Sequence, residues 1–238
     1  PNPNLSGFQV VHWGGYSNYH AMNLKIERRL TAGLALNVNY TWSKSTDAAS
    51  SPGPTFSETN FPQDVYNRTA EHALSSFDHR HRLAFSFTWE LPKGFALQGL
   101  GTFQTGAPFT VNLPSDNANI GAGPAQRPDV LRDPNLDNRT PDHWFDTSAF
   151  IMPKQFTFGN AGRNIVFGDG VTNVDISAQK LFKSKERISL QLRGEVFNVL
   201  NNTNFADAPG RIAFTPSFGR YFAAENPRQM QFALKLLF

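Results

Sequence analysis

Apolar and polar residues alternate with a period of two along several segments of the chain, which is the pattern of a strand with one apolar and one polar face. Between His20 and Leu30 one face carries Met22, Leu24, Ile26 and Leu30, and the other carries Asn23, Lys25, Glu27 and Arg29. After a three-residue break the alternation resumes from Leu34 to Ser43. The two segments therefore predict one β-hairpin with a tight turn.

The same plan recurs along the rest of the chain, with paired segments joined by short turns. The predicted strands cover residues 20–30, 34–43, 82–91, 95–105, 174–182, 187–198 and 228–238, with an eighth expected over Leu5–His12. The predicted turns cover residues 31–33, 92–94 and 183–186. Strands of about 9–13 residues match tilted membrane-spanning strands better than the roughly 5–6 residues of soluble sheets.

The connections between the pairs are long, running over residues 45–77, 109–172 and 199–227. They are rich in turn-forming residues and predict long loops with little regular structure. Strict alternation of short turns with long loops is typical of outer-membrane β-barrels, with the turns periplasmic and the loops extracellular. The pattern thus predicts an all-β, antiparallel up-and-down transmembrane barrel. A sheet of eight strands could close on its own, with an interior just filled by side chains, although such small barrels do not usually carry an extracellular loop of roughly sixty residues.

Aromatic residues cluster near the ends of the predicted strands. The residues concerned are Tyr40, Trp42, Trp89, Phe95, Phe182 and Phe238. Such positions favour an aromatic girdle at the lipid–water interface. The alternative is that aromatic residues are simply favoured in strands.

Composition narrows the class of protein further. The chain has 22 Phe, 17% charged residues and no Cys. No stretch approaches the ~20 apolar residues of a membrane-spanning helix, and the absence of Cys excludes disulfides and thiolate metal sites. A formal net charge of +3, with basic residues scattered among acidic ones, does not favour nucleic-acid binding.

Candidate chemistry is sparse. No nucleophile elbow, phosphate loop or zinc-protease motif occurs, so we expect neither an enzyme nor a bound cofactor. His79 and His81 could converge on a metal if both lay in one strand, but a structural role is favoured. His143, Trp144 and Phe145 are weak candidates for ligand contact, against the blander interpretation of a loop packing its own aromatics. The loop carboxylates are expected to be solvated: Asp47, Glu58, Asp64, Asp116, Asp129, Asp133, Asp137 and Asp142.

Charged residues also lie on the predicted polar faces of the strands, at Lys25, Glu27, Arg29, Arg82, Glu90, Arg193 and Glu195. Inside a barrel they would pair across strands and line a watery lumen. Mixed signs argue against a pore selective for ions of one charge.

Three segments carry a specific resemblance: Gly159–Ile165 (GNAGRNI), Asn173–Phe182 (NVDISAQKLF) and Leu190–Phe205 (LQLRGEVFNVLNNTNF). With Phe77–Leu83, Gly101–Thr110, Phe218–Arg220 and Pro227–Phe238, they resemble, in order, the end of TonB-dependent outer-membrane receptors of the Oar-like branch. Each motif alone is weak, and their order is what makes the likeness specific.

The resemblance implies a 22-stranded barrel in the bacterial outer membrane, closed by an N-terminal plug and energised by the TonB complex through a TonB box. It also implies insertion by the barrel assembly machinery, with Phe238 as the assembly signal. By this resemblance residues 1–238 would be the C-terminal portion of one outer-membrane barrel domain, about a third of the wall, without plug, TonB box and the remaining strands. A fragment is therefore favoured over a small free-standing barrel. The function implied is uptake of a nutrient too large for porins. The alternatives are a surface adhesion or structural barrel without transport and, less favoured, a soluble carbohydrate-binding β-sandwich.

Overall fold

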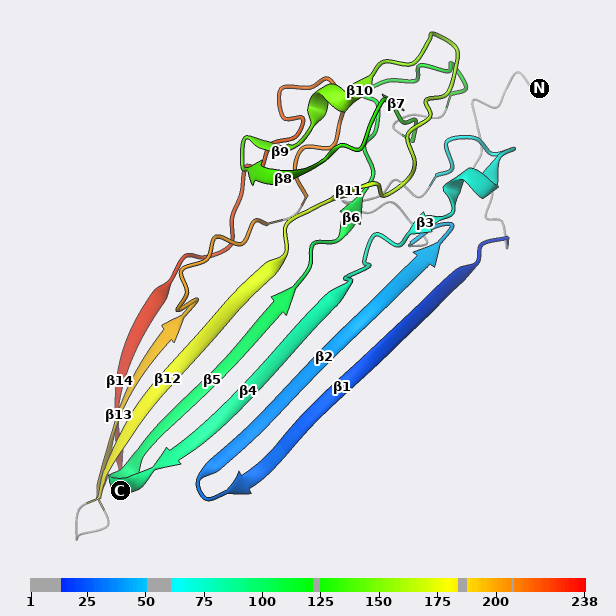
Figure 1. Cartoon of the computed structure of the whole chain (residues 1–238). Helices are drawn as coiled ribbons and strands as arrows, with labels where there is room; N and C mark the ends of the chain where they lie inside the picture. Colours follow the sequence, from blue (N-terminus) through cyan, green and yellow to red (C-terminus); the bar gives the residue numbers. More distant parts are fainter. Residues whose placement is uncertain (1–13, 51–60, 122–124, 184–187, 207) are drawn as a thin grey trace, which may run out of the picture.

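The computed structural model describes residues 14–50, 61–121, 125–183, 188–206 and 208–238. Its main feature is one antiparallel sheet of eight strands, in which seven long strands follow each other in chain order (Figure 1). These strands are β1 (Ser17–Thr31), β2 (Leu34–Asp47), β4 (His81–Leu91), β5 (Phe95–Gln104), β12 (Val171–Lys183), β13 (Ser189–Phe197) and β14 (Gln229–Leu237). The eighth, β3 (Ala73–Leu74), pairs with the end of β2. The all-β, up-and-down architecture predicted from the sequence is confirmed.

The sheet is open, because β1 and β14 lie at opposite edges and do not pair with each other. An open sheet of this kind is consistent with the predicted part of a barrel wall. The predicted pairs β1–β2, β4–β5 and β12–β13 are all hairpin neighbours, as expected. The expected strand Leu5–His12 and most of the turn 183–186 lie outside the described residues. No helix in the described ranges is long and apolar enough to cross a membrane.

The register aligns the apolar positions of neighbouring strands on one face of the sheet. Leu24 of β1 stands opposite Tyr40 of β2, which stands opposite Leu83 of β4, and Leu83 stands opposite Phe103 of β5. Because side chains alternate along a strand, every second residue of each strand, counted from these four, lies on the same face. The predicted division into an apolar and a polar face is therefore maintained across the sheet.

Aromatic rings on the apolar face cover glycines of the adjacent strand. Phe85 is opposite Gly101 and Phe87 is opposite Gly99, and each ring occupies the space that a Cβ on the glycine would need. Such covering shields a strand backbone that has no side chain of its own. The two Phe residues therefore keep the apolar face continuous over β5.

Cations also lie on this apolar face, among them Lys180 at the end near the short turns. Lys180 of β12 is opposite Phe95, and its ammonium group is 3.9 Å from the centre of that ring. The same ammonium donates a hydrogen bond to the backbone carbonyl of Lys93, in the short 3-10 turn η2 (Pro92–Gly94). The side chain thus reaches the turn with its charge while its stem stays among apolar groups.

The long loops fold together into a packed body at the other end of the strands (Figure 1). We call the described residues of segments 61–78, 106–170 and 199–227 the loop cap. Its short elements are η1 (Arg68–Glu71), β6 (Pro108–Phe109), β7 (Asp129–Val130), β8 (Asn135–Thr140), β9 (His143–Phe145), η3 (Thr147–Ala149), β10 (Phe150–Ile151) and β11 (Val166–Phe167). They pair as β6–β11, β7–β10 and β8–β9.

The loop cap has its own hydrophobic core, which comprises Phe109, Val111, Leu113, Trp144, Phe145, Ala149, Phe150, Ala161, Val166, Ala213 and Tyr221. The prediction of long loops with little regular structure is confirmed, since their elements are short, but the sequence pattern did not predict that the loops pack around a core of their own. Regular elements are short there, but side chains from two loops far apart in sequence bury each other. Packing between loops, which period-2 patterns do not reveal, stabilises the cap.

Candidate functional site

The polar face of the sheet carries charges of both signs, but they do not pair across strands as predicted. Lys25 bonds Glu27 at 2.7 Å, and Arg193 pairs with Glu195, so in each case both partners belong to one strand. Residues two apart in a strand lie on the same face, which makes such pairs geometrically simple. The cross-strand contacts on this face are hydrogen bonds instead, as between Gln191 and Gln179 at 2.6 Å and between Arg193 and Ser177 at 3.2 Å.

Two buried ion pairs join the loop cap together and to the end of β2. Arg163 donates to the carboxylate and to the carbonyl of Asp47, which lies at the last position of β2. Arg127 binds both carboxylate oxygens of Glu71, at 2.7 and 3.0 Å. All four side chains are about 95% buried. The expectation that Asp47 is a solvated loop charge was therefore wrong, because the folded cap covers it.

The remaining carboxylates predicted to be solvated differ in exposure. Asp133, Asp137 and Asp142 are exposed, whereas Asp64, Asp116 and Asp129 are half-buried. Glu58 lies outside the described residues.

The segment Gly159–Ile165 contacts several other segments of the chain at the loop end of the sheet. Gly159 accepts a hydrogen bond from Gln63 at 2.9 Å, and Asn164 donates to the carbonyl of Leu74 at 2.7 Å. The backbone of Arg127 and Pro128 lies so close to Gly159 that a Cβ there would overlap it. Glycine at this position lets two backbone segments touch.

Trp144 and Phe145, two of the three weak ligand candidates, lie in the core of the loop cap. Phe145 is fully buried, and its ring meets that of Phe218 edge-on at 5.1 Å. Trp144 donates through Nε1 to the carbonyl of Phe167 at 2.9 Å and contacts Tyr221 at 4.7 Å between ring centres. Burial favours a packing role for both residues. His143, the third candidate, is exposed.

Hydrogen bonding and burial shift several loop pKa values. Backbone and side-chain donation from Asn135 lowers the pKa of Asp133, and donation from Ser148 is the main cause that lowers the pKa of Asp146. Burial raises the pKa of Tyr221 to about 12. Asp133 and Asp146 lie in turns and Tyr221 lies in the cap interior, so local hydrogen bonds and burial account for the three pKa shifts.

His79 and His81 do not converge. His79 donates through Nδ1 to the carbonyl of Thr105 at 2.7 Å, and its Nε2 accepts from the amide nitrogen of Gln104 at 3.0 Å. A carbonyl only accepts, so Nδ1 carries the proton. His81 instead bonds the hydroxyl of Tyr40 at 2.8 Å, on the apolar face. Across the described part of the chain, no three His, Cys, Asp or Glu residues gather closely enough to hold a metal ion.

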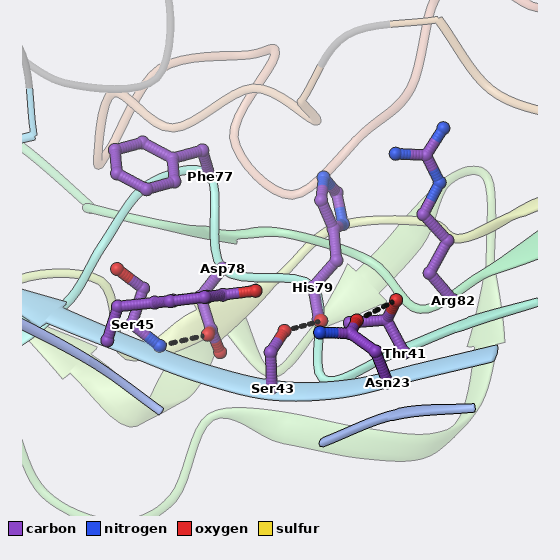
Figure 2. A pocket seen from close by; sticks show the side chains of 9 residues that line it. Asn23, Thr41, Ser43, Ser45, Phe77, Asp78, His79 and Arg82 are labelled. Carbon is purple, nitrogen blue, oxygen red and sulfur yellow. Dashed lines mark hydrogen bonds between the residues drawn. The ribbon is translucent and has the colours of Figure 1, made fainter. Parts of the chain in front are cut away.

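A hollow of about 310 Å³ lies on the polar face where β1, β2 and β4 meet the loop cap (Figure 2). We call it the wall hollow, lined by Tyr19, Asn23, Thr41, Ser43, Ser45, Phe77, Asp78, His79 and Arg82. Figure 2 shows Phe77, His79 and Arg82 extending to the same side, while Thr41 bonds Asn23 beneath them. The hollow combines aromatic rings, hydroxyls, an amide and a guanidinium, which is a lining suited to a polar ligand with a defined shape.

Sequence reasoning missed the four partners of the buried ion pairs and most of the wall hollow. A signal existed for Arg163, because it stands inside one of the motifs that carry the family resemblance. Glu71 and Arg127 had no comparable local signal. Arg82 and Asn23 were recognised as polar-face residues, but their position beside Phe77 depends on how the 61–78 segment returns to the sheet.

Comparison with known proteins gives a match to a family described as outer membrane beta barrel domain, over residues 1–231. Curated protein sequences gave no match. Among solved structures, the chain is similar to the outer membrane transporter YddB from Escherichia coli, at 11% identity and a TM-score of 0.49. That similarity covers 94% of this chain and 25% of the transporter, so the chain spans about a quarter of that protein's length.

Proposed function

The chain belongs to the outer membrane beta barrel domain family, and on this premise we propose that it forms barrel wall and ligand-capturing loops of a TonB-dependent transporter. Proteins of this family lie in the bacterial outer membrane, and the barrel wall would contact its lipid. The proposed function is energised uptake of a nutrient too large for porins, with no catalytic step. Its further partners would be the protein's own plug domain, the TonB complex and the barrel assembly machinery.

The observation that carries this proposal is the loop cap, a folded body joined to the wall by a buried ion pair. A rigid loop body can hold recognition groups in fixed positions, so that binding does not first have to order a flexible loop. The ion pair between Arg163 and Asp47 fixes the cap directly to the loop end of β2. The order of motifs resembling Oar-like receptors supports the same proposal, since the motif Gly159–Ile165 makes the contacts that build the cap.

The test is independent of any ligand. The intact protein, tagged and expressed in its own cells, would be photo-cross-linked and purified, and the product probed for TonB. We expect TonB to be recovered with it and not with a porin treated in the same way. Recovery no greater than with the porin would overturn energised transport.

A second function, adhesion, is favoured by one observation: large apolar side chains are exposed on the loop cap. Tyr66 is 96%, Phe222 70% and Phe156 65% exposed. Exposed apolar groups on the outer end of a barrel can bind another surface. If the protein is an adhesin, Phe222→Ser should reduce cell–cell aggregation while leaving the amount of protein in the membrane unchanged. Unchanged aggregation would count against adhesion.

A further inference from the structure

The wall hollow contains hydrogen-bonding groups that the protein itself does not use. Arg82 makes no hydrogen bond or ion pair with any described residue, although it lies in the hollow. Thr41 occupies the side-chain oxygen of Asn23, at 2.8 Å, and no described group binds the amide nitrogen. A guanidinium and an amide thus remain as unused donors at one place.

Several other polar groups of the hollow are already engaged and hold its shape. Ser45 donates its backbone N–H to the carboxylate of Asp78 at 2.6 Å, and Ser43 donates its hydroxyl to the carbonyl of His79 at 3.1 Å. Asp78 is almost fully buried and also pairs with Arg80 at 3.3 Å. The charge left without a partner in the hollow is therefore the positive one of Arg82.

Two aromatic side chains border the same hollow and remain open to solvent. Tyr19 is 63% and Phe77 57% exposed. An aromatic ring offers a flat apolar surface, and Tyr adds a hydroxyl at its edge. A ligand that fits all of these groups has flat apolar patches, several hydroxyls and one negative charge.

We propose that the wall hollow binds an acidic sugar residue, of the uronic acid kind, within an anionic oligosaccharide. Its carboxylate would bind the Arg82 guanidinium, whose planar fork matches a carboxylate. Its hydroxyls would bind Asn23 and the Tyr19 hydroxyl, and its C–H face would pack on Tyr19 or Phe77. This inference names the ligand class of the proposed transporter and so rests on that function.

Size and polarity separate this ligand from the alternatives. A volume of about 310 Å³ is at the lower end of the roughly 300–1,000 Å³ of ligand pockets, so one residue of a longer ligand fits. A neutral sugar would leave Arg82 without a counter-charge. An apolar ligand would bury the unused donors of Asn23 and Arg82 without partners, which opposes binding.

The experiment measures binding to outer-membrane vesicles that contain the intact protein, using a galacturonic acid trimer and a neutral galactose trimer as probes. We expect the acidic trimer to bind and the neutral one to bind at least about tenfold more weakly, because a charge-assisted hydrogen bond is lost. Arg82→Gln should weaken binding of the acidic trimer by a similar factor. Lys235→Gln is the matched control, because Lys235 is an exposed cation on the polar face of β14, outside the hollow.

Equal binding of the two trimers, absence of binding by the acidic trimer, or an Arg82→Gln protein that binds like the wild type would each overturn the proposal. So would an equal loss of binding in Lys235→Gln, since general charge attraction would then explain the preference. The vesicles are not energised, so none of these results depends on TonB. Failure here with recovery of TonB in the cross-linking experiment would reject the ligand and retain the transporter.

Discussion

The guanidinium of Arg163 donates to both the carboxylate and the backbone carbonyl of Asp47, 116 residues earlier in the chain. This contact connects the segment between β10 and β11 to the last residue of β2. Because both side chains are almost fully buried, removal of one leaves the other charge without a partner in a place that water does not reach.

Arg163→Met should therefore destabilise the loop cap by about 3–5 kcal/mol, the usual cost of breaking a buried pair. The expected result is faster cleavage of the cap by protease added to intact cells, while the barrel remains in the membrane. The control is Arg220→Met, which removes the exposed pair with Asp142 and should cost less than about 1 kcal/mol. Equal cleavage rates in the two variants would show that the buried pair does not stabilise the cap.

The two faces of β14 predict opposite responses to the same substitution. Leu234 is opposite Leu192 on the apolar face, so Leu234→Arg should cost about 2–4 kcal/mol near the membrane midplane. Gln231 is opposite Glu195 on the polar face, where an added cation meets a carboxylate, so Gln231→Arg should be tolerated. The amount of folded, heat-modifiable barrel measures both. If the two variants assembled equally well, the assignment of the faces would be wrong.

Tyr221 predicts the behaviour of the cap in alkali. Burial raises its pKa from 10.0 to about 12, so the folded cap keeps a proton that the unfolded chain releases. This contribution to stability is complete below about pH 10 and is lost as the pH rises from about 10 to 12. The difference in ultraviolet absorbance between wild type and Tyr221→Phe should show a tyrosine ionising near pH 12. A difference curve with its midpoint at pH 10 would contradict the burial of this hydroxyl.

The last residue gives a prediction that rests on the family resemblance. Phe238 follows β14 and is 98% exposed, so its removal breaks no packing contact in the sheet. Deleting it should nevertheless slow insertion, because the resemblance implies that the assembly machinery recognises the terminal aromatic. Pulse-chase labelling of folded barrel measures the rate, with Phe238→Tyr as the aromatic control. Normal insertion without Phe238 would contradict an assembly signal at this position.

The strands were predictable from the sequence because their signal is local. Alternation at Leu24, Lys25 and Ile26 reports which side faces lipid without knowledge of any distant residue. Even so, each strand is longer or shorter than predicted by a few residues, as with β1, which runs from Ser17 to Thr31. Ends of this kind depend on where a neighbouring strand stops pairing.

The loop cap was not predictable in this way, because its contacts join residues far apart in the chain. The side chains of Arg127 and Glu71 are 56 residues apart, and nothing near either one indicates a buried partner. Trp144 and Phe145 show the same limit, because their local sequence is compatible with an exposed contact patch and with a packed core alike. The wall hollow needs both kinds of information: strand register for Asn23 and Arg82, and loop packing for Phe77.

The position of Lys180 at the boundary of the apolar face has a consequence for membrane thickness. If the short turns face the periplasm, as the sequence predicts, the Lys180 charge lies at the periplasmic end of the apolar face, and the hydrogen bond between Tyr40 and His81 lies toward its outer end. On β5 the apolar face runs from Phe95 to Phe103, eight residue steps or roughly 26 Å along the strand. With a strand tilt of about 40° this corresponds to a height of ~20 Å. The wall therefore matches a thin bilayer, and a thicker membrane would have to compress around it or leave the Lys180 ammonium group in contact with lipid chains.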